Sequence, residues 1–487
     1  MHSRNRRLRA SSLIAVALAP SFFIGCGTLQ LDRNINQYHR PSRSSVVDHR
    51  EPTRPPFVGV AISGGGSRSA NFAAAVMEEL DYYGFLDHVN AISAVSGGTL
   101  PAAYYVLKRK KPDWNWGNLR SRVGANIYSR LLLKHINPWK LLNYAFTEYN
   151  RSDMMAEVFD DLLLDNATFG DIDPSMPQLL INATEINGAS FVFSTEMSYN
   201  LRSSFADYPI SRALAASTSV PGIFQGIAIR TYQTEDNFSY LHLVDGGITE
   251  NLGLENLLQH YMDEENTAAH PLRKVPPRAC FIFLIDASAS GSEAQRVASY
   301  QRRDLRNWSD FIVDRNLMNA FDVMFGRAHS QFISRLRGRL DDDAVFESPI
   351  QLNYGRVNCT IWQFHPRFLI YHGLRFDNPD NYPIAAQLSA ILSQIETHWK
   401  LSSPTSCSSA ALQAALYDGA RMLVSADRGA LNTAITWFAS HDLRMKQDVP
   451  RSSPYEFFSK HVSAVTSENN VYNGSGVYGQ VFCERGD

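Results

Sequence analysis

Ser96 lies in the stretch "AVSGGT" (residues 94–99), whose residue types suit a nucleophile. The stretch follows the largely apolar run "VNAIS" (residues 89–93) and precedes an apolar helical pattern, the strand–turn–helix context that a nucleophile elbow needs. Such elbows usually read G-x-S-x-G, and here Ala94 stands at the first glycine with only a methyl group. Gly97 and Gly98 are small, as a cramped turn requires. Ser96 is therefore a candidate nucleophile, and an ordinary loop serine beside a Gly-Gly turn is the alternative.

A glycine-rich turn, "SGGGSRSA" (residues 63–70), could hold an anion. Its glycines let the backbone approach a ligand and direct N–H groups toward it, and the following helix N-terminus adds partial positive charge. The anion could be a phosphate or the oxyanion of a tetrahedral acyl intermediate. The stretch lacks the Lys-Ser/Thr pair of a phosphate-binding P-loop and has no acidic residue placed for a ribose.

Asp245 could supply the base that an activated serine needs. It ends the apolar stretch "LHLVDGG" (residues 241–247), and Gly246 and Gly247 turn the chain directly after it, which presents the carboxylate at a strand tip. We expect this strand to be parallel to its neighbours. A turn-capping aspartate is the alternative. His242 lies an odd number of residues away and faces the opposite side of the strand, so it receives no role.

The elements that must position these residues alternate between strand and helix. Such alternation predicts an α/β fold with a mostly parallel central sheet covered by helices on both faces, whose chemistry gathers at the carboxyl ends of the strands. The pattern predicts strands at residues 57–63, 89–96, 178–186, 190–195, 241–247 and 279–288, and helices at 67–86, 97–110 and 210–219.

Taken together and in this order, the three stretches resemble the patatin-like phospholipases. The likeness extends to "LLINATEINGASFVFST", "ISRALAASTSVPGIF", "DGGITENLGL" and, near the C-terminus, "SPTSCSSAALQAALYDGARMLVSAD". The resemblance covers roughly residues 57–426 and implies a three-layer α/β hydrolase domain with no cofactor and no metal. It also implies lipid acyl hydrolysis, with membrane phospholipids or lysophospholipids as substrates.

The resemblance also implies roles for individual residues. Ser96 would be the nucleophile and Asp245 its base, a Ser–Asp dyad without a histidine. The oxyanion hole would be the loop Gly64, Gly65, Gly66, Ser67 and Arg68, with the amides around Gly65, Gly66 and Ser67 as donors; Gly97, Gly98, Gly246 and Gly247 would form the elbow and turn. Two positions depart from the family pattern, since Ser69 and Ala94 replace glycines.

Three other functions remain open at this stage. A Ser–His–Asp esterase would place its histidine late in the chain, where His365, His372 and His441 are available. An inactive membrane-anchored binding or scaffold lipoprotein could keep the fold without turnover. A phosphate-binding protein could use the Gly-rich turn alone. A formal net charge of -2 without a clustered basic run argues against nucleic acid as a partner.

The N-terminus predicts export. "MHSRNRRLRA" carries four arginines, a short apolar stretch follows, and "FIGC" places Cys26 where bacterial lipoproteins carry their lipidated cysteine. We expect a lipoprotein signal peptide over residues 1–25, a lipidated Cys26 and flexible tether over 26–56, the hydrolase domain over 57–426, and a C-terminal extension of unknown role over 427–487. The mature protein would be anchored to a bacterial membrane, in the outer membrane with a periplasmic or surface face.

Two further features have more than one interpretation. An exported chain can form disulfides, and Cys407 with Cys483 is one conceivable pair among the four cysteines after Cys26, although their spacing does not fix the pairing. Apolar residues recur at helical spacing over residues 300–340. That stripe indicates core packing or a lid or membrane-docking helix pair beside the active site.

Overall fold

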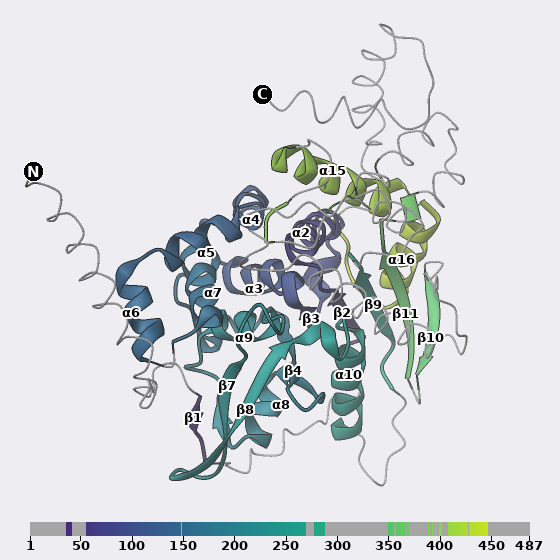
Figure 1. Cartoon of the computed structure of the whole chain (residues 1–487). Helices are drawn as coiled ribbons and strands as arrows, with labels where there is room; N and C mark the ends of the chain where they lie inside the picture. The colour runs from purple at the N-terminus through teal and green to yellow at the C-terminus, as the bar shows by residue number, and fades with distance from the viewer. Residues whose placement is uncertain are drawn as a thin grey trace, which may run out of the picture.

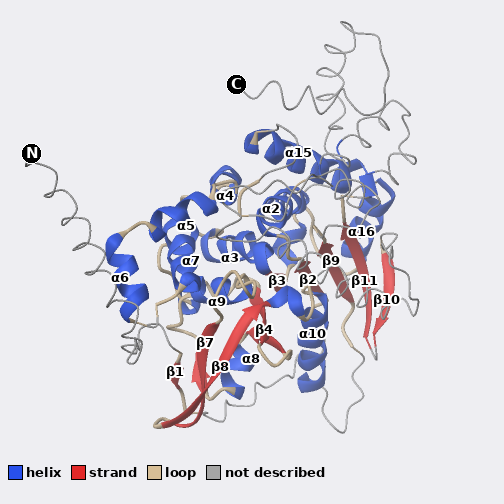
Figure 2. Cartoon of the chain, in the orientation of Figure 1, coloured by secondary structure: helices blue, strands red, loops and turns tan. Residues whose placement is uncertain are grey.

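A computed structural model of the chain describes residues 36–40, 55–147, 149–268, 277–287, 349–354, most of 357–369, single positions between 388 and 401, and 408–446 apart from 427. A nine-stranded mixed sheet forms its centre, and helices pack on both of its faces (Figures 1 and 2). The predicted fold class is confirmed.

The bounds of the elements are as follows. The strands are β1 (Gln37–Tyr38), β2 (Phe57–Ile62), β3 (Ala91–Val95), β4 (Gln178–Glu185), β5 (Ser190–Phe193), β6 (Ser203–Ser204), β7 (Ile227–Thr234), β8 (Asn237–Asp245), β9 (Cys280–Ile285), β10 (Ile350–Tyr354) and β11 (Val357–Phe364). The helices are α2 (Gly66–Tyr83), α3 (Thr99–Lys108), α4 (Trp116–Val123), α5 (Ile127–His135), α6 (Pro138–Phe146), α7 (Arg151–Phe159), α8 (Thr195–Asn200), α9 (Ile210–Ser217), α10 (Leu254–Ala268), α15 (Ser409–Arg421) and α16 (Arg428–Ser440).

The centre of the sheet is parallel. Strands β11, β9, β2, β3 and β4 pair in parallel in that order. The sequences of β2, β3 and β9 are continuous apolar or small runs, and every residue in them is buried, as expected for strands covered on both faces. Antiparallel strands extend this centre: β10 pairs with β11, and β8, β7 and β5 continue the sheet from β4. Strands β7, β10 and β11 were not anticipated from the sequence.

Helix α2 is more buried than an amphipathic stripe predicts. Phe72, Val76 and Leu80 recur at helical spacing and form a fully buried apolar stripe, yet every other residue of the helix except Glu78 and Tyr82 is buried too. Helix α15 explains this, because its Leu412 and Leu416 join the same hydrophobic core. Helix α10 covers the opposite face of the sheet, where its Leu257, Leu258 and Tyr261 pack against β2 and β9.

Strands β3 and β8 end at the same place. Residues 181–184 of β4 pair with β5 along one edge. The other edge of β4 pairs first with β3, up to Val95 opposite Asn182, and then with β8, from Asp245 opposite Ala183. Because β8 is antiparallel to β4, it runs toward β3 along this edge. The expectation of a parallel strand before Asp245 is therefore wrong, but the antiparallel strand brings its last residue directly beyond the end of β3.

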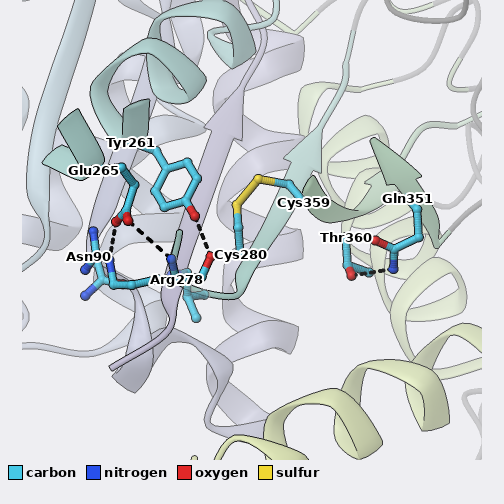
Figure 3. Close-up of a disulfide and its surroundings, with 9 residues drawn as sticks. Asn90, Tyr261, Glu265, Arg278, Cys280, Gln351, Cys359 and Thr360 are labelled. Carbon is cyan, nitrogen blue, oxygen red and sulfur yellow. Dashed lines mark hydrogen bonds and ion pairs between the residues drawn. A yellow bond between two sulfur atoms is a disulfide. The ribbon is translucent and has the colours of Figure 1, made fainter. Parts of the chain in front are cut away.

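A disulfide joins two neighbouring parallel strands. Cys280 of β9 and Cys359 of β11 are register partners with Cα atoms 4.5 Å apart, and their sulfur atoms are bonded (Figure 3). The bridge closes a loop with a sequence separation of 79 residues, which restricts the unfolded chain. Cys407 and Cys483, the pair considered from sequence, lie outside the described residues, as does the apolar stripe at residues 300–340.

Segments at both ends of the predicted hydrolase domain contact it. Strand β1, inside the predicted tether, pairs with β6, and the Asn36 side chain bonds to Ser203 and to the backbone of Arg230. Helix α16, beyond residue 426, places Phe438 in the main core against Phe85. No helix in the described part of the chain combines the length and apolar composition needed to cross a membrane.

Candidate active site

Ser96 stands on a sharp turn between β3 and α3. Val95 is extended, and Ser96 then adopts a positive φ of 47°, a left-handed conformation that is strained for a residue with a side chain. Two hydrogen bonds stabilise the turn. The Ser96 amide donates to the Ser217 hydroxyl (2.9 Å), and this hydroxyl donates to the carbonyl of Asn182 in β4 (2.5 Å). A strained serine held in this way presents its hydroxyl at the strand end, as a nucleophile elbow does.

Asp245 meets Ser96 at this point. The Ser96 hydroxyl donates to Asp245 Oδ2 at 3.0 Å, and the Gly247 amide donates to Oδ1 at 2.8 Å. The Asp245 backbone is fixed as well, because its amide donates to the carbonyl of Ser219. The structure therefore brings the two residues of the predicted dyad together within hydrogen-bond distance.

Burial makes Asp245 a suitable base near neutral pH. The side chain is 1% exposed, and this burial raises the pKa of the Asp245 carboxyl to about 7 from an ordinary value of 3.8. The hydrogen bonds from Gly247 and Ser96 oppose the increase because they favour the ionised form. A base with a pKa near the operating pH combines a sufficient ionised fraction with enough basicity to accept a proton.

The Gly-rich loop lies against the elbow and opens α2. Gly65 and Gly66 have φ values of 139° and 55°, which only glycine adopts readily, and a Cβ on Gly97 would lie 2.1 Å from the Gly66 carbonyl oxygen. Helix α2 starts at Gly66, so the first amides of the helix have no partner within it. The amides of Gly65, Gly66 and Ser67 are therefore the candidate oxyanion donors.

Two residues of the predicted oxyanion hole have other partners. The Gly64 amide donates to the carbonyl of Asn251 at 2.9 Å. The buried Arg68 guanidinium donates to the carbonyls of Ala287 and Ile395 and so joins the loop to the segment after β9. These contacts hold the loop in place, and the assignment of Gly64 and Arg68 to the oxyanion hole stays a prediction.

Both departures from the family pattern occupy positions that do not need glycine. Neither Ala94 nor Ser69 is among the residues with positive φ. Ala94 is a fully buried residue of β3, where a methyl group packs in the core. Ser69 lies in the first turn of α2, and its hydroxyl donates to the carbonyl of Ser63 (2.5 Å) within the Gly-rich loop. Both substitutions fit the backbone without strain.

Several polar residues support the site without having been predicted. Ser217 and Ser219 lie in "AASTS" and hold the backbones of Ser96 and Asp245. Asn182 of β4 donates to Ser93 and to the carbonyl of Ala94 beneath the elbow. The available signal was the polar Asn182 in an otherwise apolar strand, because a buried polar group needs partners; Ser217 and Ser219, at and after the end of α9, have no comparable signal. Glu250, just after the Asp245 turn, is also buried, which raises the pKa of its carboxyl to about 8.

The late histidines lie elsewhere in the described part of the chain. His441 contacts Trp437 and Ser440 at the end of α16. His365 is buried after β11 beside Phe368. His372 lies outside the described residues. Among described residues no histidine bonds to Ser96 or Asp245, and no group of three or more potential metal ligands is found.

We expect Gly97→Ala to lower turnover by a factor of about 10² to 10³, the effect of losing one oxyanion donor. The added Cβ would overlap the backbone of Gly66 and displace the loop that carries the donors. The check is kcat on a water-soluble ester, with Gly117→Ala in helix α4 as control, since Gly117 does not have a positive φ and a Cβ there would contact only the Asn115 side-chain oxygen, at 3.1 Å. Equal activity of both variants would remove the loop from the mechanism.

Comparison with known proteins identifies one sequence family. Residues 60–258 match the profile described as patatin-like phospholipase. No curated protein gives a significant match. Solved structures with some likeness include human GIVD cytosolic phospholipase A2, at 14% identity and a TM-score of 0.43 over 79% of this chain and 60% of that one.

Two further structures are similar to the same degree or less. The human enzyme in complex with methyl gamma-linolenyl fluorophosphonate matches at 14% identity and a TM-score of 0.41, over 81% of this chain and 62% of that one. VipD from Legionella pneumophila matches at 11% identity and a TM-score of 0.28, over 83% of this chain and 72% of that one. The chain spans about three fifths of the length of the human structures.

Proposed function

We propose that the chain is a serine lipid acyl hydrolase that uses a Ser96–Asp245 dyad, because residues 60–258 match the patatin-like phospholipase profile and contain both residues of the dyad. The observation that carries the proposal is the 3.0 Å hydrogen bond from the hydroxyl of Ser96, whose backbone has a positive φ, to Asp245, whose burial raises the pKa of its carboxyl to about 7. The proposed substrates are membrane phospholipids or lysophospholipids.

The reaction has two halves. In the first, Ser96 Oγ attacks the ester carbonyl carbon and gives its proton to Asp245, while the carbonyl oxygen becomes an oxyanion held by the amides of Gly65, Gly66 and Ser67. The intermediate collapses, and the lipid alcohol leaves with the proton from Asp245. In the second half, Asp245 takes a proton from water, and the resulting hydroxide attacks the carbonyl carbon of the acyl group. The second intermediate collapses as the bond between Ser96 Oγ and the acyl carbon breaks, Asp245 returns the proton to Ser96 Oγ, and the fatty acid departs.

The test is fatty-acid release from mixed phospholipid vesicles, with phospholipid and lysophospholipid products separated by mass. Folded wild-type chain should release fatty acid and accumulate the matching alcohol. If the folded wild-type chain releases no acid from vesicles and none from a soluble ester, the proposal is overturned. The inactive binding lipoprotein is then favoured.

We also propose that the chain is exported and anchored through a lipid on Cys26. The Cys280–Cys359 disulfide supports export, because disulfides persist in oxidising compartments. We expect Cys26→Ser to lack acyl mass by intact-protein mass spectrometry and to be extracted from membranes by high-salt carbonate buffer, whereas the wild type should require detergent. An unmodified Cys26 in membrane-bound wild type would contradict the anchor.

A further inference from the structure

An exposed apolar surface lies on α5 and α6, at one edge of the molecule and away from the central sheet (Figure 1). We call residues 127–146 the α5–α6 hairpin. Of the eleven large hydrophobic residues that are exposed in the described chain, eight lie on it. Trp139 is 76% exposed, Ile136 64% and Leu133 63%, and the other five are Tyr128, Leu132, Leu142, Tyr144 and Phe146.

The hairpin is locally well formed. Asn126 caps α5 by accepting from the Ser129 amide, and Asn137 caps α6 by accepting from the Trp139 amide, with Pro138 in the first turn. Only Ile127 and Leu131 of α5 are buried in the core. The hairpin therefore holds its large apolar side chains in a defined arrangement although little of the described protein covers them.

The charges of the hairpin favour a phospholipid surface as the partner. Residues 127–146 contain Arg130, Lys134, His135 and Lys140 and no acidic residue. Lys134 and Lys140 bond to Glu157 of α7, which secures the inner side, whereas Arg130 is exposed. Two copies meeting through this surface would bring like charges together. Lipid phosphates would instead be attracted, and the exposed tryptophan and tyrosines have the amphipathic rings that favour membrane interfaces.

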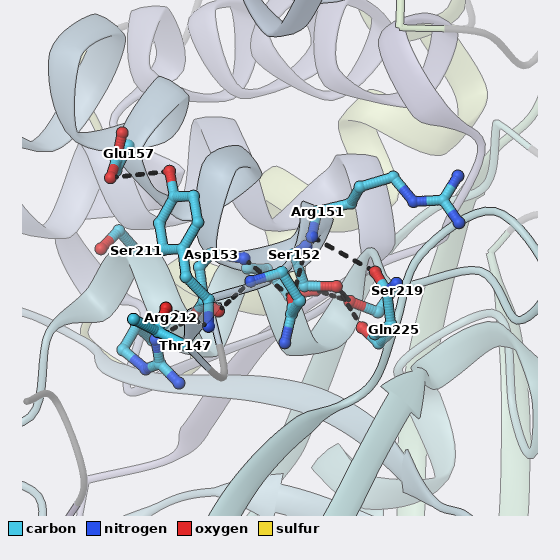
Figure 4. A network of polar contacts seen from close by, with 12 residues as sticks. Thr147, Arg151, Ser152, Asp153, Glu157, Ser211, Arg212, Ser219 and Gln225 are labelled. Carbon is cyan, nitrogen blue, oxygen red and sulfur yellow. Dashed lines mark hydrogen bonds and ion pairs between the residues drawn. The ribbon is translucent and has the colours of Figure 1, made fainter. Parts of the chain in front are cut away.

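Polar contacts connect the hairpin to the candidate active site. Tyr144 accepts a hydrogen bond from the Gln225 side chain (3.4 Å), and the Gln225 side-chain oxygen accepts from the amide of Arg151. Ser152 bonds both to the Gln225 carbonyl and to the Ser219 hydroxyl, as Figure 4 shows. Ser219 in turn holds the Asp245 amide. The surface is thus joined to the segment that supports the dyad.

We propose that the α5–α6 hairpin inserts Leu133, Ile136 and Trp139 into the interfacial layer of a phospholipid bilayer and docks the enzyme on its substrate. The proposal rests on the proposed function, because it supplies the surface from which the lipid would be drawn. It names a second membrane contact that is independent of Cys26.

Vesicle binding without turnover tests the docking. The parent protein is the full chain with Cys26→Ser and Ser96→Ala, which removes lipidation and hydrolysis, and its binding is measured by flotation with vesicles of phosphatidylethanolamine and phosphatidylglycerol. Adding Leu133→Ser, Ile136→Ser and Trp139→Ala should weaken binding by a factor of the order of 10² or more, since three apolar side chains lose their burial. The control is Ile186→Ser, which removes a side chain that is also 76% exposed.

The outcomes separate this proposal from the proposed function. With Ser96 restored in both proteins, the triple variant should hydrolyse a water-soluble ester as fast as the chain that carries only Cys26→Ser, and it should lose activity on vesicles. Equal flotation of the parent and the triple variant, or no flotation of the parent, would overturn the docking even if ester hydrolysis is intact. A parent dimer that the triple variant converts to monomer, without any vesicle binding, would assign the surface to a second copy. If no protein that carries Ser96 hydrolyses the soluble ester, the proposed enzymatic function is contradicted. The flotation result would still test the docking.

Discussion

Ser96→Ala is expected to lower kcat for ester hydrolysis by a factor of the order of 10⁶, as removal of the nucleophile does in a serine protease that works by the same two half-reactions. The hydroxyl is the group that would form the acyl-enzyme, and among the described hydrogen bonds Ser96 provides the one hydroxyl that donates to the Asp245 carboxylate. The measurement is steady-state release of acid from a soluble ester and from phospholipid vesicles.

A second substitution at the same position controls for folding. Ser96 has a φ of 47°, so Ser96→Gly should relieve the backbone strain and be more stable than Ser96→Ala by about 1 kcal/mol while being equally inactive. Thermal unfolding of the two variants checks this. Substantial turnover by a well-folded Ser96→Gly would show that the nucleophile is another residue.

Asp245→Asn is expected to lower kcat by about 10⁴, the loss seen when the aspartate of a serine triad becomes an amide. The amide cannot accept the proton from Ser96. Because burial raises the pKa of Asp245 to about 7, wild-type kcat/KM should fall as the pH decreases below about 7, where the carboxyl becomes protonated. A wild-type profile that stays flat down to pH 5 would contradict the role of Asp245 as base.

The same substitution should raise stability at neutral and higher pH. The folded pKa of Asp245 is above the ordinary value of 3.8, so the folded state binds a proton more tightly than the unfolded state. This contribution to stability is therefore lost as the pH rises from about 4 through 7, where the buried carboxylate must ionise. The Tm of Asp245→Asn should exceed that of wild type at pH 8, and the difference should shrink toward pH 4.

Much of the fold could be predicted because its central strands are apolar on both faces. The runs of β2, β3 and β9 have no polar alternation, which indicates parallel strands in a covered sheet. The orientation of β8 could not be predicted in this way. It is set by pairing with β4 over a register of three residues, and nothing local to "LHLVDGG" distinguishes a parallel from an antiparallel partner.

The candidate site could be predicted only in part, because contacts between residues that are distant in sequence have no local signature. The glycine turns mark Ser96 and Asp245, since tight turns have a local signature. The groups that fix these residues do not: Ser217, Ser219 and Asn182 are distant in sequence from the elbow and meet it through the packing of α9 and β4. The Cys280–Cys359 bridge likewise depends on β9 and β11 being neighbours, although 79 residues separate the two cysteines.

Covalent labelling with an alkyl fluorophosphonate tests the central claim most directly. The reagent transfers its phosphonyl group to an activated serine with loss of fluoride, and peptide mass spectrometry locates the adduct. The Ser96–Asp245 dyad predicts a single adduct on Ser96 in folded wild type, strongly reduced labelling of Asp245→Asn, and none of Ser96→Ala. An adduct on another serine, or no adduct in folded wild type under conditions where a serine hydrolase control reacts, would contradict it.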